Sequence, residues 1–201
     1  SLLKFCLKEQ LGGLEFLTGI PGTVGGAAVT NAGLKTSWFS SRVKTVTVLT
    51  PEKQTTVGRE EICFGYRYSS LTSTFVFSVQ LQLLAEKPSL IHSRMVAFMR
   101  KRREKQPPPF GTAGSVFKNP PGHFAGELIE RCGLKGYSLG GAQISPKHAN
   151  IIVNTGQASS SEIWRLIQLV RERVKQQYNI CLELEINCLG RFDESCGSGR
   201  R

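Results

Sequence analysis

Hydrophobic and polar residues alternate with the period of a β-strand in two stretches of the first half of the chain. β-Branched residues dominate residues 42–49, and residues 54–57 can pair back after a Pro-Glu-Lys turn, so the pattern predicts a hairpin. In residues 74–83 a hydrophobic side chain stands at every second position, which predicts that these side chains share one face of a strand. They are Phe75, Phe77, Val79, Leu81 and Leu83.

A helix is predicted after Pro88, where hydrophobic residues recur with helical spacing. Ser89 is expected to cap its N-terminus, and the three prolines at 107–109 to end it. Four consecutive cations, residues 100–103, fall in its last turns, where they complement the negative end of the helix dipole. The hydrophobic stripe consists of Ile91, Met95, Phe98 and Met99.

Two further helices and a strand are predicted in the second half. The first helix covers residues 124–132 and ends at Gly133, and the second opens with a capping box made by Ser159 and Glu162. Residues 180–189 alternate again and predict a last strand, on which Glu183 and Glu185 share a face. The second helix is expected to bury Ile163, Leu166, Ile167, Val170 and Val174.

Helices and strands mix without a regular βαβ alternation, which predicts an α+β fold. Residues 16–33 contain too many glycines for us to expect a regular helix or strand there. The pattern changes near residues 86–89, so we expect one domain over residues 1–86 and a second over 87–190. Residues 191–201 are polar and rich in Gly and Ser, and we expect them to be disordered.

The composition narrows the class of protein. Of 201 residues 40% are hydrophobic, which excludes disorder over most of the chain. No apolar stretch approaches the roughly 20 residues that cross a bilayer, and no secretion signal is visible, so we expect neither a transmembrane nor an exported protein. The net charge of +11 predicts an anionic partner, which could be nucleic acid, a membrane surface or phosphorylated small molecules. A basic surface that serves only solubility is the alternative.

The six cysteines and three histidines form no metal-binding pattern. No Cys-x-x-Cys pair occurs, and the histidines stand far apart in the sequence, so we expect no metal site. Scattered cysteines are typical of free thiols in a reducing cytosol.

Four segments could carry chemistry, each with a plainer alternative. The glycine loop at 19–33 could cradle a diphosphate with its N–H groups, or be a tightly packed connection. Arg67 offers a fork suited to carboxylate or phosphate, or is an ordinary surface arginine between two tyrosines. Ser115 and Lys118 could present a hydroxyl and an ammonium, or belong to a common turn. Glu183 and Glu185 could include a catalytic acid, or lie on a solvated face.

Taken in order, six segments resemble one family, the flavin-dependent UDP-N-acetylenolpyruvoylglucosamine reductases, which make UDP-N-acetylmuramate for bacterial peptidoglycan. The segments span the chain from Gly13 to Gly190. They are GLEFLTGIPGTVGGAAVTNAG (13–33), GYRYSSL (65–71), AGSVFKNP (113–120), ELIERCGLKG (127–136), GGAQISPKHANIIVNTGQAS (140–159) and LELEINCLG (182–190).

The resemblance implies a role for individual residues. The family's catalytic arginine, serine and glutamate fall on Arg67, Ser115 and Glu185. Its cofactor-contacting segment falls on Gly19, Ile20, Pro21, Gly22, Thr23, Gly25, Gly26 and Asn31. Its UDP-sugar-binding positions fall on Tyr66, Lys105, Lys118 and Asn119.

The resemblance also implies a fold and a reaction. We expect residues 1–86 to be part of a two-lobed FAD-binding domain of the PCMH type, and residues 87–190 to be a smaller substrate-binding domain. NADPH would reduce a tightly bound FAD and leave, and the reduced flavin would then pass a hydride to the enolpyruvyl UDP-sugar. The protein would be a cytoplasmic monomer that binds neither nucleic acid nor membranes and takes no metal.

The sequence departs from the family's pattern in three places. The family's N-terminal stretch with a Gly-Gly-Gly-Ser-Asn-like loop has no counterpart here, so we expect the chain to be the back part of a larger enzyme. Residues 34–36 are Leu-Lys-Thr where the family has Ala-Tyr-Gly, and Leu184 replaces a proline. Two alternatives remain at this point: a basic nucleic-acid-binding module, and a related flavoenzyme with another substrate.

Overall fold

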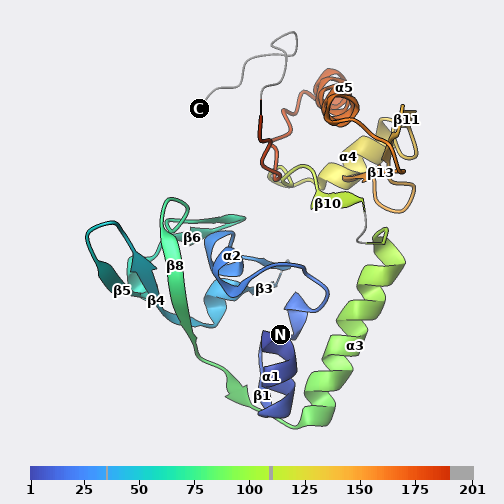
Figure 1. The fold of residues 1–201 in the computed structure, drawn as a ribbon. Helices are drawn as coiled ribbons and strands as arrows, with labels where there is room; N and C mark the ends of the chain where they lie inside the picture. Colours follow the sequence, from blue (N-terminus) through green and yellow to red (C-terminus); the bar gives the residue numbers. More distant parts are fainter. Residues whose placement is uncertain (35, 109–110, 191–201) are drawn as a thin grey trace. The chain divides into compact units, whose positions relative to one another are not determined.

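The chain folds into two compact units, each around its own hydrophobic core (Figure 1). The computed structural model describes residues 1–34, 36–108 and 111–190. The units are Ser1–Glu104 and Lys105–Arg201, and the mixture of helices and strands confirms the α+β class. The division by contacts falls at the end of helix α3 (Pro88–Lys105), whereas the domain boundary after residue 86 remains a prediction. The expected tail at 191–201 lies outside the described residues.

A three-stranded antiparallel sheet forms the centre of the first unit (Figure 1). Strand β4 (Val43–Leu49) pairs with β5 (Gln54–Gly58) and with β8 (Phe75–Leu81), which confirms the hairpin and the third strand. The core beneath β4 also contains Leu14 and Phe39. The short elements around it are α1 (Leu2–Lys8), β1 (Leu11–Gly12), η1 (Glu15–Leu17), β2 (Gly33–Leu34), β3 (Ser37–Trp38), η2 (Phe39–Ser41), η3 (Arg59–Glu61) and β9 (Leu84–Ala85).

The prediction that alternating hydrophobic residues of β8 share one face is wrong. The pairing with β4 skips one residue between Ser78 and Val76, which places a β-bulge at Phe77. The bulge turns Val76 toward the core and leaves Phe75 and Phe77 67% and 60% exposed. Alternation in sequence gives a common face only where each residue opposes one partner residue.

The glycine-rich segment contains a helix, contrary to our expectation. Helix α2 (Val24–Val29) begins after Thr23, whose hydroxyl oxygen accepts a hydrogen bond of 3.0 Å from the Gly26 amide. The helix packs against β8, and Gly25 lies over Val76. Tertiary packing therefore overrides the low helix propensity of the two glycines inside α2.

Helix α3 confirms the helix predicted after Pro88, with Ile91 fully buried. The expected cap at Ser89 is wrong, because the helix already begins at Pro88. The fixed φ of proline suits the first helical position, where no intrahelical N–H donor is needed. The helix ends at Lys105, before the run of prolines.

An ion-pair cluster joins α3 to the rest of the first unit. Arg94 donates a hydrogen bond of 2.6 Å to Glu15, whose side chain is 8% exposed, and also bonds Glu86. These hydrogen bonds raise the pKa of Arg94, those to Glu86 contributing most, and lower the pKa of Glu86. A Cβ at Gly12 would collide with the Glu86 carboxylate, so a larger residue there would force the Glu86 side chain to shift.

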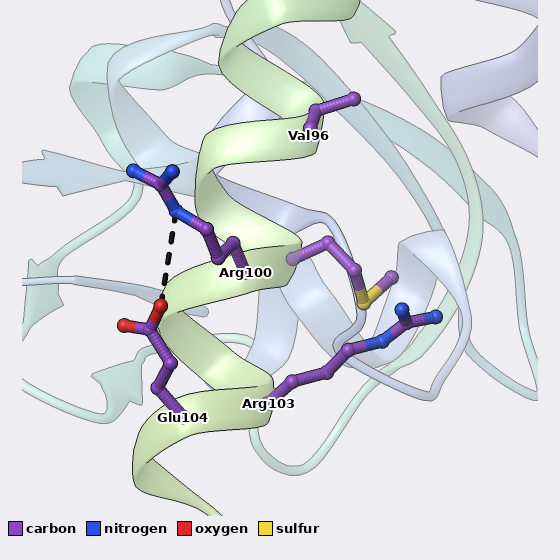
Figure 2. Close-up of a pocket in the computed structure, with 5 residues that line it drawn as sticks. Val96, Arg100, Arg103 and Glu104 are labelled. Atoms are coloured by element: carbon purple, nitrogen blue, oxygen red, sulfur yellow. Dashed lines mark ion pairs between the residues drawn. The ribbon is translucent and has the colours of Figure 1, made fainter.

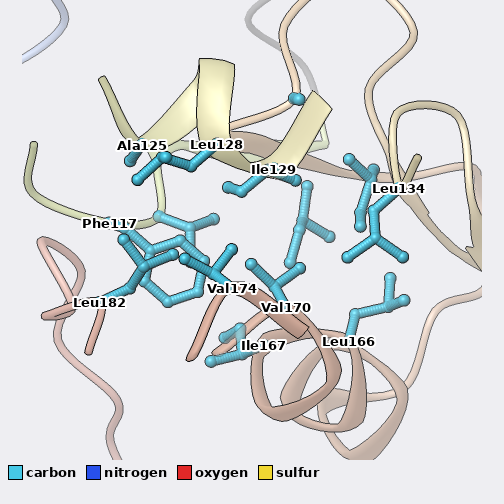
Figure 3. Close-up of a cluster of buried hydrophobic side chains, with 14 of the residues drawn as sticks. Phe117, Ala125, Leu128, Ile129, Leu134, Leu166, Ile167, Val170, Val174 and Leu182 are labelled. Carbon is cyan, nitrogen blue, oxygen red and sulfur yellow. The ribbon is translucent and has the colours of Figure 1, made fainter. Parts of the chain in front are cut away.

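The second unit consists of a four-stranded antiparallel sheet and two helices around one core (Figure 3). The strand order is β10 (Thr112–Ser115), β13 (Ile151–Asn154), β12 (Ala142–Ile144) and β11 (Ser138–Leu139). Helix α4 (Ala125–Arg131) and helix α5 (Ser160–Tyr178) confirm the two predicted helices and the capping box. Residues of α5 buried in the core are Leu166, Ile167, Val170 and Val174, with Ile163 partly buried against it.

The strand expected over residues 180–189 is not formed. Within the described residues this segment makes only an isolated bridge, between Leu184 and Phe117. Leu182 is buried in the core, and Leu184 and Ile186 pack against it. The alternation in the sequence therefore reflects one face that packs on the core, although the segment forms no ladder with another strand among the described residues.

Candidate active site

Arg67 lies at the tip of a short hairpin in the first unit. Strands β6 (Phe64–Gly65) and β7 (Tyr68–Ser69) pair antiparallel and are joined by Tyr66 and Arg67. The backbone of Arg67 has φ 54°, in the left-handed region that non-glycine residues rarely adopt. The alternative of a featureless surface arginine does not fit, because the side chain is half-buried and held in this strained position.

Three hydrogen bonds tie this hairpin to the segment that follows α2. The Asn31 amide donates to the Gly65 carbonyl (2.9 Å), Arg67 Nη1 donates to the Gly33 carbonyl (3.1 Å), and Ser69 Oγ donates to the Val29 carbonyl (2.7 Å). The structure thus brings Arg67 beside the predicted cofactor segment.

Asn31 itself is buried, and its side-chain oxygen accepts from the Ser40 amide at 3.1 Å. Both ends of the side chain are therefore engaged within the protein, which indicates a structural role for this predicted cofactor residue. Tyr66 is 42% exposed and packs edge-on against Trp38, with ring centroids 5.9 Å apart.

The predicted cofactor loop is open and polar. Gly19 and Gly22 have φ of 79° and 144°, and Pro21, Gly22, Thr23 and Gly26 are exposed, whereas Ile20 and Gly25 are half-buried. Within the described part of the chain, the N–H groups of Val24 and Gly25 donate no hydrogen bond. Thr18 is 6% exposed, and its hydroxyl finds no partner among the described residues.

Arg102 reaches this loop from α3, which sequence reasoning missed. Its Nε donates to the Thr18 carbonyl at 3.2 Å, and a Cβ at Gly19 would come within 2.8 Å of Arg102 Cδ. The guanidinium is half-buried, and this burial lowers its pKa. The signal available in the sequence was a basic run, which gave no hint that one of its members turns inward.

Ser115 and Glu185 lie close together in the second unit. Ser115 is the last residue of β10, opposite Ile151. The chain then pairs with the segment of the two glutamates: the Glu185 amide donates to the Val116 carbonyl at 2.8 Å, and the Lys118 amide donates to the Glu183 carbonyl at 2.8 Å. The predicted catalytic serine and glutamate are thus linked through Val116, and both side chains are half-buried.

Two predicted substrate residues have partners within the protein. The Lys118 ammonium pairs with the Glu183 carboxylate. Asn119 accepts a hydrogen bond of 3.0 Å from the Ala125 amide and so supports the start of α4. A phosphate group could replace Glu183 as the partner of Lys118, because the carboxylate is largely exposed.

In the basic run at the end of α3, Arg100, Lys101 and Arg103 are exposed and Arg102 is half-buried. Arg102 turns inward, and Arg100 pairs with Glu104 at 3.8 Å (Figure 2). Figure 2 shows the groove along this helix, lined by Val96, Met99, Arg100, Arg103 and Glu104. Lys105 is exposed at the end of the helix and does not line this groove.

Within the described residues, neither a metal site nor a membrane span is seen. No group of three metal-ligating side chains occurs among the described residues. Over the same residues, none of the helices is long and hydrophobic enough to cross a membrane.

Comparison with known proteins places the chain in a family. Residues 106–189 match the profile of the UDP-N-acetylenolpyruvoylglucosamine reductase C-terminal domain. The chain is 46% identical over 192 residues to the UDP-N-acetylenolpyruvoylglucosamine reductase of Moorella thermoacetica, covering 94% of this chain and 64% of that protein. It is 45% identical over 188 residues to the enzyme of the same name from Thermotoga maritima, covering 92% and 66%.

A solved structure agrees with these relatives. The crystal structure of UDP-N-acetylenolpyruvylglucosamine reductase from Thermus caldophilus superposes with a TM-score of 0.82 at 38% identity, covering 92% of this chain and 67% of that one. The chain thus spans about two thirds of the length of the relatives that it matches. Over that length, sequence and fold agree, and the chain belongs to the UDP-N-acetylenolpyruvoylglucosamine reductase family.

Proposed function

We propose that the protein reduces the enolpyruvyl group of UDP-N-acetylglucosamine enolpyruvate to give UDP-N-acetylmuramate for peptidoglycan synthesis, with FAD as cofactor and NADPH as reductant. The observation that carries this proposal is the pairing of the Ser115 segment with the Glu185 segment through Val116, in a chain of this family. A serine hydroxyl can supply a proton, and a protonated carboxyl group can stabilise an enolate.

The first unit fits the proposed cofactor. The N–H groups of Val24 and Gly25, which donate no hydrogen bond among the described residues, could bind a diphosphate, and the glycines at 19 and 22 allow close approach of the backbone. The buried Thr18 hydroxyl without a partner marks the same loop. FAD, when bound there, supplies the hydride acceptor and donor that the reaction needs. We further propose that residues 1–86 belong to a two-lobed FAD-binding domain of the PCMH type.

Arg67, Ser115 and Glu185 would divide the work at the substrate. Arg67 carries a permanent charge and would stabilise the negative charge that develops on the substrate carboxylate. Glu185 in its protonated form would donate a hydrogen bond to the same enolate. The Ser115 hydroxyl would deliver the proton to the carbon next to the carboxylate. Lys118 would bind the diphosphate of the UDP-sugar, and we propose Asn119, Lys105 and Tyr66 as further substrate-binding residues.

The charge and the cysteines are consistent with this proposal. A net charge of +11 suits FAD, NADPH and a UDP-sugar, each of which carries a diphosphate. The five described cysteines are free thiols, which is typical of the reducing cytoplasm, where we place the reaction. We propose a monomer, because every residue assigned a role comes from this one chain.

The proposal is tested with the flavin-loaded protein under anaerobic conditions. NADPH should bleach the flavin absorbance, and the enolpyruvyl UDP-sugar should restore it. Arg67→Ala and Ser115→Ala should each slow turnover by roughly a hundredfold or more. The exposed residues Arg165 and Ser160 provide matched controls, whose replacement by alanine should leave turnover unchanged. Near-normal turnover of either site variant would contradict the assignment.

The related flavoenzyme with another substrate is tested in the same assay. UDP should compete with the substrate if Lys118 binds the diphosphate, and Lys118→Ala should weaken this competition. A flavin that is reduced by NADPH and not reoxidised by the enolpyruvyl UDP-sugar would favour another substrate.

A further inference from the structure

Asn150 holds the backbone of Phe117 from both sides. It stands immediately before β13, and its side chain lies in the interior, with the residue 4% exposed. The Phe117 amide donates to Asn150 Oδ1 (3.0 Å), and Asn150 Nδ2 donates to the Phe117 carbonyl (2.8 Å). The backbone carbonyl of Asn150 also accepts from the Val116 amide at 2.8 Å.

These bonds lie where the chain changes partner. Residues 112–115 pair with β13, whereas residues 116–118 pair with residues 183–185. The side-chain amide of Asn150 takes the place of a neighbouring strand at Phe117, whose ring is buried in the core (Figure 3). Without the Asn150 side chain, the buried N–H and carbonyl groups of Phe117 would lack these hydrogen-bond partners. An amide is the side chain that offers a donor and an acceptor at once in this geometry.

We propose that Asn150 is a positioning residue that sets the Ser115 hydroxyl relative to the Glu185 carboxyl. The inference rests on the proposed function. Val116 adjoins Ser115 through a peptide bond and Glu185 through a hydrogen bond, so the place of both depends on residues 116–117. If Phe117 is released, the serine and the glutamate shift against each other. A misplacement of about 1 Å can slow a reaction by about a hundredfold.

The kinetic test compares Asn150→Ala with Asn154→Ala in the flavin-loaded protein. Asn154 is the matched control, because it ends β13, the strand that Asn150 precedes, and its side chain instead accepts from the Gly156 and Ala158 amides. For Asn150→Ala we expect unchanged flavin reduction by NADPH and a roughly 10- to 100-fold slower reduction of the enolpyruvyl substrate, with little change in KM. Equal slowing of both half-reactions, or wild-type rates in both, would overturn the inference.

The structural test uses amide hydrogen exchange and does not depend on activity. Asn150→Ala should speed exchange at the Phe117 and Glu185 amides and leave the amides of α5 protected, and unchanged exchange at the first two would also overturn the inference. Should Asn150→Ala fail to fold, Asn150→Asp keeps the shape and the acceptor but loses the donor, and the same half-reaction split is expected.

The two proposals fail in different ways. A wild-type protein that does not reduce the enolpyruvyl substrate would overturn the proposed function and the positioning role with it. A wild-type protein that turns over normally, with an Asn150→Ala variant equally fast, would overturn the positioning role alone.

Discussion

The candidate residues of the two units are presented by different kinds of structure. Arg67 lies in a two-residue loop with a strained backbone, and hydrogen bonds to Val29 and Gly33 hold its hairpin. Ser115 ends a strand of a sheet that is backed by the core of α4 and α5. The turn that carries Arg67 is placed by hydrogen bonds, whereas Ser115 is placed by the packing of its sheet together with the hydrogen bonds of Asn150 to Phe117. This difference makes the two units respond differently to mutation.

The largest effect is expected from a cavity in either core. Leu14 and Leu166 are both 1% exposed or less, one in each unit. Replacing either by alanine should lower the free energy of unfolding by about 2–5 kcal/mol, because the transfer free energy is lost and a cavity remains. Hydrogen exchange should show loss of protection confined to the unit that carries the substitution. Equal loss of protection in both units would show that they unfold together and would break the comparison.

The next effect concerns charge. Arg94→Ala should destabilise the first unit by about 2 kcal/mol, because Glu15 would keep a buried carboxylate without its partner. The value is set below that of a fully buried pair, since Arg94 is 41% exposed and water can replace part of its contribution. In the second unit the exposed pair of Arg131 and Glu127 is the control, and Arg131→Ala should cost less than about 0.5 kcal/mol. Chemical denaturation of each variant measures its loss of unfolding free energy. Similar losses for Arg94→Ala and Arg131→Ala would contradict this prediction.

Backbone strain separates the two catalytic candidates directly. At Arg67, with φ 54°, the glycine variant should be more stable than the alanine variant by about 1 kcal/mol, because only glycine adopts this conformation without cost. Ser115 lies in a strand and its φ is not positive. Ser115→Ala should therefore be more stable than Ser115→Gly. Both variants at each position lack the functional side chain, so the difference in melting temperature reports the backbone alone. If the glycine variant were more stable than the alanine variant at both positions, the proposed difference between Arg67 and Ser115 would be contradicted.

The sequence predicted regular elements well where a single rule dominates. Ser159 with Glu162 located the start of α5, and the spacing from Leu166 to Val174 identified its buried face. Prediction failed where tertiary contacts decide. The bulge at Phe77 depends on the register with β4, and α2 depends on packing against β8.

The site was predicted by motifs and only in part by chemistry. The resemblance indicated Arg67, Ser115 and Glu185, and their assigned roles remain predictions. The residues that hold them could not be inferred, because Asn150 and Phe117 are separated by 33 positions and meet only in the fold. Asn31, which stays a predicted cofactor residue, donates a hydrogen bond to the Gly65 carbonyl, a contact that the sequence did not indicate. Polar residues that support a site and those that bind a ligand carry the same signal in a sequence.

The smallest effect that we expect is a pH dependence confined to the second unit. Burial lowers the pKa of His148 below its ordinary value, Lys135 and Lys105 act in the same direction, and a backbone hydrogen bond and Glu130 oppose them. His148 Nδ1 accepts a hydrogen bond of 3.2 Å from the backbone N–H of Asn150, so Nδ1 must be unprotonated. The unfolded chain therefore binds this proton at a higher pH than the folded chain.

It follows that the second unit should lose stability as the pH falls below about 6.5, because protonation favours the unfolded state there. His148→Gln should flatten this slope in urea titrations between about pH 7.5 and pH 5, whereas His92→Gln, at an exposed position of the first unit, should not. A slope that persists in His148→Gln would assign it to other groups. His148 accepts a hydrogen bond from Asn150, and Asn150 in turn holds Phe117. A flatter dependence of stability on pH in His148→Gln would therefore point to a proton that is bound next to the segment of Ser115.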